Sequence, residues 1–341
     1  MKIRPVILCG GAGTRLWPQA KNNQVKQFID FGGWSLLEKT LYRVKGTTFD
    51  YPIISTNFKY LKKVRSYLKK FKFKKYKIIL EPAKKNTAPA ILSSALIKDI
   101  SSIQPLIFLP ADHLIEKTSL FNKAINRNKN NLNNQNIFIF GIKPTEPSNE
   151  YGYFLTKKIK GNINKVTKFI EKPNKNKAKQ IIKKKGYWNS GMFFARKDSI
   201  INNFKKYQSN VYKNCLKSFS KAKLKNNTYH LNKASFSKVT EKSFDYAILE
   251  KAKEINAIKL DIPWSDLGSW REISKIYRRN KSKYFKKKNV YYRPWGRYVN
   301  LFKGQNFLVK ELTVNSKSSI SLQKHHHRSE HWMITQGKPR I

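Results

Sequence analysis

Three glycines, an arginine and a lysine follow the first apolar run of the chain and define its first candidate site. The run at residues 6–9 leads into GGAGTRLWPQAKNNQVKQF, residues 10–28. Bare glycine backbone lets N–H groups approach phosphate oxygens, and the Arg15 guanidinium can hold a phosphate through two hydrogen bonds. Lys26 follows closely enough in the chain to return to the same phosphates. The candidate contacts of this predicted phosphate loop are Gly10, Gly11, Gly13, Thr14, Arg15 and Lys26.

The spacing of the glycines argues against two familiar phosphate loops. The sequence has no G-x-x-x-x-G-K-[ST] pattern, so the loop is not a Walker A sequence. Leu16 stands where a dinucleotide fingerprint has its third glycine, which weakens that interpretation. A glycine-rich turn without a ligand is the alternative, and the neighbouring Arg15 favours the phosphate loop over it.

Acidic residues follow several apolar runs, where strands of an open α/β sheet place ligands. Asp112 follows the run LIFLP, and Asp266 follows the run that ends near Ile262. Two carboxylates at separate strand ends supply the hard oxygen ligands that a Mg²⁺ ion bridging phosphates needs. Glu171 and Lys172 close another strand, where the carboxylate can accept hydrogen bonds and the ammonium can bind a phosphate. The alternative for Asp112 is that it caps a turn or pairs with a lysine.

These residues need a framework, and the alternation of short apolar runs with helical patterns over the first 270 residues predicts an α/β sheet. The expected strands are Val6–Cys9, Pro52–Ser55, Lys77–Leu80, Pro105–Leu109, Ile137–Gly141, Val166–Ile170, Met192–Ala195 and Ala257–Ile262. Ser35 and Glu38 have the spacing of a capping box. We expect Thr87 and Ser243 to cap two further helices.

Net charge is the most unusual property of the composition. The 341 residues include 71 Lys and Arg against 20 Asp and Glu, which gives a net charge of +51. A basic surface suggests nucleic acid as a partner, but the lysines run through every segment instead of forming one stripe. In segment 59–77, Val64, Leu68 and Phe71 recur at helical spacing and leave the lysines on the outer face. We therefore expect a biased composition on solvated faces, with a field that attracts small anionic substrates.

Cysteine usage and hydropathy indicate the cellular setting. Cys9 and Cys215 are too few for a disulfide framework and favour a reducing cytosol. The sequence has no apolar run near the roughly 18 residues that span a bilayer. The short run before Gly10 reads as a buried strand and not as a signal peptide. We expect a cytoplasmic protein that does not bind a membrane.

The order G-x-G-T-R-L-W-P…K-Q-F resembles the signature of sugar-phosphate nucleotidyltransferases. More narrowly, the chain is similar to bacterial mannose-1-phosphate guanylyltransferases of the long, bifunctional type, which carry a C-terminal mannose-6-phosphate isomerase module. Further blocks that resemble this family, in its order, are EPAKKNTAPAI (81–91), FLPADHLI (108–115), FGIKPTEPSNEYGYF (140–154), FIEKP (169–173), YWNSGMFFAR (187–196), SFDYAILEK (243–251) and PWSDLGSW (263–270). The resemblance covers nearly all of residues 1–275 and implies a Rossmann-like nucleotidyltransferase domain with a mixed, mostly parallel sheet.

The resemblance implies a reaction and assigns residues to it. GTP and α-D-mannose 1-phosphate would give GDP-mannose and pyrophosphate by in-line attack on the α-phosphorus, with Mg²⁺ as the cofactor. Arg15 and Lys26 would be catalytic, and Asp112 and Asp266 would be the metal ligands. The remaining contacts would be Gly10, Gly11, Gly13, Thr14, Asn86 and Thr87 with the nucleotide, and Gly152, Glu171, Lys172 and Asn189 with the sugar phosphate. The chain departs from the family at Ala20, Val25, Lys84, Lys85 and Ala111, and the lysine pair bears on the nucleotide contacts.

The C-terminal stretch has candidate metal ligands of a second kind. We expect a nucleotidyltransferase domain over 1–280, a linker over 281–290 and a β-rich segment over 291–341. SLQKHHHRSEHW (321–332) resembles the first half of a cupin metal motif, with Gln323, His325, His327 and Glu330 as candidate ligands. The motif also needs a later histidine, and the stretch stops in mid-pattern at Ile341. The sequence therefore predicts an incomplete cupin-like segment without isomerase activity.

Three other interpretations stay open at this point. The chain could act on another pair of nucleotide and sugar 1-phosphate, since the pocket residues do not fix the substrates. It could be a basic nucleic-acid-binding protein with an enzyme-like fold, which would bind RNA or DNA with a steep dependence on salt. It could also be an enzyme that has lost its activity. Whether it forms a homo-oligomer is also open.

Overall fold

The structure is a computed structural model that describes residues 1–11, 25–29, 34–159, 163–268, 272, 290–303, 307–320 and 329–338, with 302 and 303 as backbone only. Contacts divide the chain into two compact units. Unit 1 comprises Met1–Ile29 and Ser35–Asp266, and unit 2 comprises Asp30–Trp34 and Leu267–Ile341. The predicted linker 281–290 lies, except for Val290, outside the described residues.

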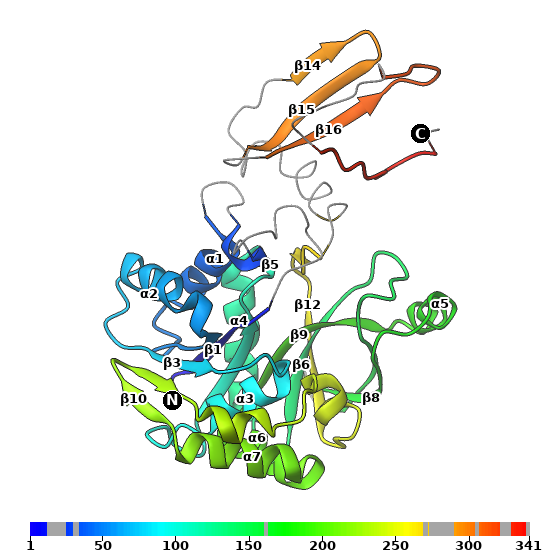
Figure 1. Ribbon diagram of the computed structural model, residues 1–341. Helices are drawn as coiled ribbons and strands as arrows, with labels where there is room; N and C mark the ends of the chain where they lie inside the picture. Colours follow the sequence, from blue (N-terminus) through cyan, green and yellow to red (C-terminus); the bar gives the residue numbers. More distant parts are fainter. Residues whose placement is uncertain are drawn as a thin grey trace. The chain divides into compact units, whose positions relative to one another are not determined.

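Unit 1 is built on an eleven-stranded mixed sheet (Figure 1). Its strands are β1 (Arg4–Cys9), β2 (Ile53–Asn57), β3 (Lys77–Glu81), β4 (Pro105–Pro110), β6 (Ile137–Ile142), β7 (Tyr153–Lys158), β8 (Asn164–Ile170), β9 (Tyr187–Arg196), β10 (Lys223–Lys225), β11 (Thr228–His230) and β12 (Ile255–Leu260). They lie in the order β10-β11-β3-β2-β1-β4-β9-β6-β12-β8-β7. All eight strands expected from the sequence are present in this sheet, and the predicted α/β class is confirmed.

The two sides of the sheet differ in strand direction. On one side, β1 runs parallel to β2 and β4, and β2 runs parallel to β3. On the other side, β9 runs antiparallel to β4 and β6, and β7 runs antiparallel to both β8 and β9. The expectation of a mostly parallel sheet therefore holds for the side that carries β1, while the side that carries β7 is largely antiparallel.

Helices cover the sheet and complete its core. They are α1 (Leu36–Arg43), α2 (Leu61–Lys70), α3 (Thr87–Ala95), α4 (Thr118–Asn128), α5 (Lys175–Lys183), α6 (Lys197–Tyr207), α7 (Ser209–Ser220) and α8 (Lys233–Ser237), with short 3-10 turns at Lys26–Phe28, Phe58–Tyr60 and Lys129–Asn131 and a π-helical turn at Asp245–Leu249. Figure 1 shows α3, α6 and α7 gathered together, and their apolar faces share one buried cluster with Val6, Ile53 and Phe108 of the strands. This packing fixes the strand ends that carry the predicted site.

Local sequence signals explain several helix starts. Ser35 and Glu38 form the expected capping box, in which the Ser35 N–H donates to Glu38 Oε2 at 2.7 Å. In α2, Val64 and Leu68 are buried while the lysines beside them are exposed, as predicted.

The predicted cap at Thr87 is wrong, because Asn86 occupies the N-cap position of α3. The Asn86 side chain accepts a hydrogen bond from the Thr87 N–H at 2.9 Å. Asn86 has a φ of 66° and lies outside the helical conformation, so Thr87 is the first helical residue. Ser243 Oγ accepts from the Tyr246 N–H at 3.3 Å, but the helix that follows is only the π-helical turn.

Unit 2 contains a three-stranded antiparallel sheet of β14 (Val290–Arg293), β15 (Gly296–Lys303) and β16 (Leu308–Val314). This sheet covers the first part of the predicted β-rich segment 291–341, and the described residues after Val314 form no strand. Gly296 has a φ of +141°, and a Cβ atom there would lie 2.0 Å from the Thr313 carbonyl oxygen, so this position requires glycine. None of the helices in the part of the chain that the structure describes has the length and apolar character needed to cross a bilayer.

Candidate active site

A short antiparallel ladder places the two predicted metal ligands side by side. The strand β5 (Leu114–Ile115) comes soon after Asp112, and the strand β13 (Trp264–Ser265) comes just before Asp266. Because β5 and β13 pair antiparallel, the residues before one strand lie opposite the residues after the other. The two acids therefore meet beyond the carboxyl ends of β4 and β12, although they are far apart in the sequence.

Lys26 contacts both Asp112 and Asp266. It lies in the first 3-10 turn and is 5% exposed. Its Nζ atom donates to Asp112 Oδ2 at 3.0 Å and also to the main-chain carbonyl of Asp266. The neighbouring Gln27 side chain donates to the Gly11 carbonyl at 3.2 Å, which ties this turn to the glycine loop. The alternative that Asp112 pairs with a lysine is therefore observed, that lysine is itself a predicted site residue, and the role of Asp112 as a metal ligand stays a prediction.

The charge of Lys26 sets the protonation of its neighbours. Burial alone raises the pKa of Asp112, but Lys26 and His113 outweigh it, so the pKa lies below the ordinary value and the group is a carboxylate. Burial lowers the pKa of His113 to about 4, which leaves its imidazole neutral near pH 7. Its Nε2 atom lies 3.9 Å from Asp112 Oδ1. The site therefore presents an ionised acid that is already matched by one cation.

Three of the predicted sugar-phosphate contacts converge at a second cluster. Gly152 precedes β7, Glu171 follows β8 and Asn189 lies in β9. A Cβ atom on Gly152 would lie 2.4 Å from Glu171 Oε2 and 3.5 Å from the Asn189 Cβ. The Asn189 N–H donates to the Gly152 carbonyl at 2.8 Å. Lys172 is exposed beside them, with a φ of 43°. The structure therefore brings these residues together as the sequence predicts.

Asp245 belongs to this cluster, and the sequence did not single it out. The Asn189 Nδ2 donates to Asp245 Oδ1 at 2.8 Å, while Asn189 Oδ1 accepts from the Gly191 N–H at 3.3 Å. Burial and repulsion from Asp245 raise the pKa of Glu171 to about 7, and burial raises the pKa of Asp245 to about 6. Asp245 opens the π-helical turn, a geometry that often marks functional sites and leaves no simple sequence signal.

The predicted nucleotide contacts are only partly within the described residues. Gly10 and Gly11 follow β1, and a Cβ atom on either would meet none of the described atoms within 4 Å. The Thr87 hydroxyl accepts from the Phe244 N–H at 2.9 Å, which ties α3 to the π-helical turn. Asn86 caps α3 as described above, so both residues have structural contacts and their nucleotide roles stay predictions. Gly13, Thr14 and Arg15 lie outside the described residues.

The predicted cupin ligands are also mostly beyond the described part of the chain. Gln323, His325 and His327 fall outside it, while Glu330 is described and exposed. The cupin metal site therefore stays a prediction.

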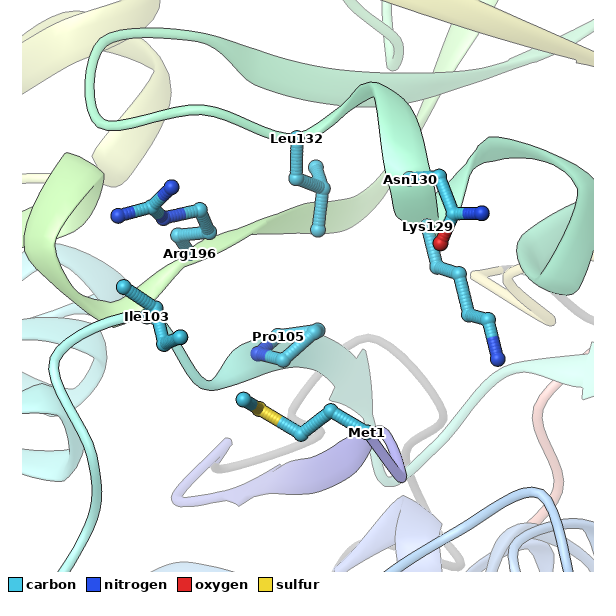
Figure 2. Close-up of a pocket in the computed structure, with 7 residues that line it drawn as sticks. All are labelled: Met1, Ile103, Pro105, Lys129, Asn130, Leu132 and Arg196. Atoms are coloured by element: carbon cyan, nitrogen blue, oxygen red, sulfur yellow. The ribbon is translucent and has the colours of Figure 1, made fainter.

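A cavity of about 180 Å³ lies elsewhere on unit 1 (Figure 2). Figure 2 shows Pro105 and Arg196 among its lining side chains, with Met1 and Ile103 beside them. Pro105 begins β4, whereas Asp112 follows the end of that strand. The cavity therefore lies at the amino end of β4, whereas the predicted site lies beyond the carboxyl end of this strand, so the cavity is not part of the predicted site.

The chemistry of the acid pair fits a metal that is shared with a substrate. Among the described residues, no group of three or more His, Cys, Asp and Glu side chains is arranged to hold a metal ion by itself. Asp112 and Asp266 supply two hard oxygen donors. Mg²⁺ usually takes one or two carboxylates and completes its shell with phosphate oxygens and water. The pair therefore suits a divalent ion that arrives with a phosphorylated ligand.

The fold and the site together define an α/β protein with charged and polar residues gathered beyond the carboxyl ends of its strands, where open α/β sheets bind their ligands. Comparison with known proteins agrees with this class. A family model described as nucleotidyl transferase matches residues 4–283, and one described as mannose-6-phosphate isomerase C-terminal matches residues 279–341. The chain belongs to the nucleotidyl transferase family, whose members generally use a divalent metal ion.

Named relatives align over the full chain. Mannose-1-phosphate guanylyltransferase RfbM of Salmonella typhimurium is 29% identical, with 100% of this chain and 86% of the relative covered. Alginate biosynthesis protein AlgA of Pseudomonas aeruginosa is 27% identical, with 99% and 85% covered. A mannose-6-phosphate isomerase structure from Helicobacter pylori is 27% identical with a TM-score of 0.68, over 78% of this chain and 100% of that chain. A Thermus thermophilus structure described as a mannose-1-phosphate geranyltransferase shares the fold, with a TM-score of 0.71, 24% identity, and 81% and 79% covered.

Proposed function

We propose that this chain is a mannose-1-phosphate guanylyltransferase that converts GTP and mannose 1-phosphate into GDP-mannose and pyrophosphate with Mg²⁺. The observation that carries the proposal is the convergence of Lys26, Asp112 and Asp266 at one edge of the sheet. The relatives named for this reaction support the choice of substrates.

The second cluster supplies the place for the sugar. Tyr151 and Gly152 are neighbours in the chain, and so are Trp188 and Asn189. The Tyr151 and Trp188 rings pack together with centroids 4.8 Å apart, and the Tyr151 hydroxyl reaches Asp266. The Gly152 and Asn189 positions border Glu171 instead. The proposed sugar pocket and the acid pair are therefore bordered by residues that are neighbours in the chain. A reaction between two bound substrates requires this proximity.

Both substrates are anions, so the protein must hold them together against their repulsion. An ammonium has three N–H donors, and Lys26 uses two on Asp112 and Asp266, so the third can bind a phosphate oxygen. Glu171 accepts hydrogen bonds from sugar hydroxyls, and Asn189, fixed by Asp245, donates to another. A divalent ion held by Asp112 and Asp266 would neutralise phosphate charge and the charge that develops on the leaving pyrophosphate. Arg15 and the loop amides complete the predicted set.

A substrate panel tests the proposal directly. Pyrophosphate release is measured for each pairing of GTP, UTP, ATP and dTTP with mannose 1-phosphate and glucose 1-phosphate, with Mg²⁺ and with EDTA. We expect GTP with mannose 1-phosphate to give the highest kcat/KM and EDTA to abolish the activity. Equal rates for UTP with glucose 1-phosphate would contradict the substrate assignment.

Isomerase activity and location stay separate predictions. A coupled isomerase assay on the same preparation tests whether the chain also interconverts mannose 6-phosphate and fructose 6-phosphate. A cytoplasmic location is proposed together with the biosynthetic reaction, and cell fractionation tests it.

A further inference from the structure

Tyr151 makes a contact that neither the sequence motifs nor the proposed reaction accounts for. Its hydroxyl donates a hydrogen bond to Asp266 Oδ1 at 2.8 Å. The main-chain carbonyl of Asp266 also accepts a hydrogen bond from Lys26. A cation therefore contacts the backbone of Asp266, and a neutral donor contacts its carboxylate.

The ring of Tyr151 is held on two sides by tryptophans. Its centroid lies 4.8 Å from that of Trp188 in β9 and 5.5 Å from that of Trp264 in β13. Trp264 in turn packs edge-on against His113 with a centroid distance of 5.5 Å. Aromatic contacts of this kind restrict the orientation of the ring and involve no charged group. The surrounding strands therefore determine the position from which the Tyr151 hydroxyl donates to Asp266.

The type of donor matters for a carboxylate that is to bind a cation. A phenol is a neutral donor, so it orients the Asp266 carboxylate without offsetting its negative charge, whereas the Lys26 ammonium offsets part of the charge of Asp112. Hydrogen bonds to ligating carboxylates commonly set metal affinity in this way. The contact between Tyr151 and Asp266 therefore has the features of an orienting contact.

We propose that Tyr151 is a positioning residue that holds the Asp266 carboxylate in the orientation that binds a divalent metal ion together with Asp112. The proposal rests on the proposed function only for the identity of the site. Tyr151 does not touch a substrate in this role and acts through Asp266. Gly152 follows Tyr151 directly in the chain. The same short segment therefore orients Asp266 through Tyr151 and forms one wall of the proposed sugar pocket through Gly152.

Tyr151→Phe tests the proposal because it keeps the ring and removes only the hydroxyl. Tyr153→Phe is the matched control, because Tyr153 is a buried tyrosine two residues away whose hydroxyl contacts Ser148 instead, accepting from its N–H at 2.8 Å and donating to its carbonyl at 3.0 Å. The primary measurement is the binding of Mn²⁺ in the presence of a non-hydrolysable GTP analogue, followed by electron paramagnetic resonance, which needs no turnover. We expect Tyr151→Phe to weaken Mn²⁺ binding by about 10-fold to 100-fold. Tyr153→Phe should change it less than about 2-fold.

Steady-state kinetics supply a second readout that a purely structural role would not move. For Tyr151→Phe, the Mg²⁺ concentration for half-maximal rate should rise, the KM for mannose 1-phosphate should stay unchanged, and high Mg²⁺ should restore kcat. Melting temperatures of both variants show whether folding is affected.

The outcomes separate this inference from the proposed function. Unchanged Mn²⁺ binding in Tyr151→Phe overturns the inference, and so does equal weakening in both variants. A wild-type protein that binds Mn²⁺, shows the Tyr151→Phe effect and yet lacks guanylyltransferase activity supports the inference and contradicts the proposed function. Wild-type protein that binds no Mn²⁺ with the GTP analogue overturns both.

Discussion

Replacing Gly152 with alanine gives the sharpest test of the sugar pocket. The added Cβ atom would lie 2.4 Å from Glu171 Oε2, whereas non-bonded heavy atoms need about 3.5 Å. The Glu171 carboxylate must therefore retreat by about 1 Å, because Phe169 and the Asn189 Cβ, at 3.3 Å and 3.5 Å, leave the new methyl group little other room. The φ of Gly152 lies outside the left-handed region, so alanine adds no backbone strain.

The expected effect is on sugar binding and not on folding. A displacement of about 1 Å in a substrate-positioning group costs up to about 100-fold in rate, so kcat/KM for mannose 1-phosphate should fall about 10-fold to 100-fold. This corresponds to about 1.4 to 2.7 kcal/mol of lost transition-state stabilisation. The KM for GTP should change little, because the displaced group faces the sugar. The assay is pyrophosphate release with each substrate varied in turn, alongside thermal melting.

Gly186→Ala is the control for this substitution. Its Cβ atom would lie 2.3 Å from the Ile181 Cγ2 and 2.9 Å from the Ile181 carbonyl oxygen, at the turn between α5 and β9. Because backbone cannot yield as a carboxylate tip can, we expect a loss of about 1 to 3 kcal/mol in stability with an unchanged KM for mannose 1-phosphate. If Gly152→Ala behaved like Gly186→Ala, with lower stability and normal sugar kinetics, the reasoning about Glu171 would be refuted.

Three further predictions follow from the described residues. Asp112→Asn and Asp266→Asn should each lower kcat/KM by about 100-fold or more with an unchanged circular dichroism spectrum, and near-normal rates would remove the metal assignment. Burial raises the pKa of the Glu81 carboxyl to about 7, so its contribution to stability is complete below about pH 4.5 and is lost as the pH rises to 7. In denaturant titrations at pH 5 and pH 8, the free energy of unfolding of the wild type should fall by about 3 kcal/mol relative to that of Glu81→Gln. Burial raises the pKa of both Cys9 and Cys215 to about 12, so a thiol reagent should modify neither in the folded protein at pH 8 and both in denaturant.

Much of the fold was accessible from the sequence because the central strands are short, fully apolar and flanked by clear breaks. β9 shows the limit of this reasoning. The sequence predicted only its Met192–Ala195 part. The structure continues the strand from Tyr187 through a glycine at φ +70°, supported by pairing with both β6 and β7. Such pairing depends on strands that are distant in the chain, and local propensity does not report it.

The candidate site was accessible to the extent that its residues sit at strand ends. Asp112, Glu171 and Lys26 could be proposed because each follows a recognisable run or loop. Tyr151 and Asp245 could not be proposed, because their roles depend on which side chain lies opposite them in the folded chain. A tyrosine beside a glycine and an aspartate in an apolar block carry no local sign of the partners that tertiary structure gives them.

The position of Lys26 has a consequence for the order in which ligands assemble. Lys26 already balances the Asp112 carboxylate with an internal cation that has almost no contact with solvent. A bare divalent ion entering this spot would meet this fixed like charge at close range. A triphosphate brings several negative charges of its own, which attract the metal ion and offset its repulsion from Lys26. Metal and nucleotide should therefore load as one unit, and neither equilibrium can be measured meaningfully without stating the concentration of the other.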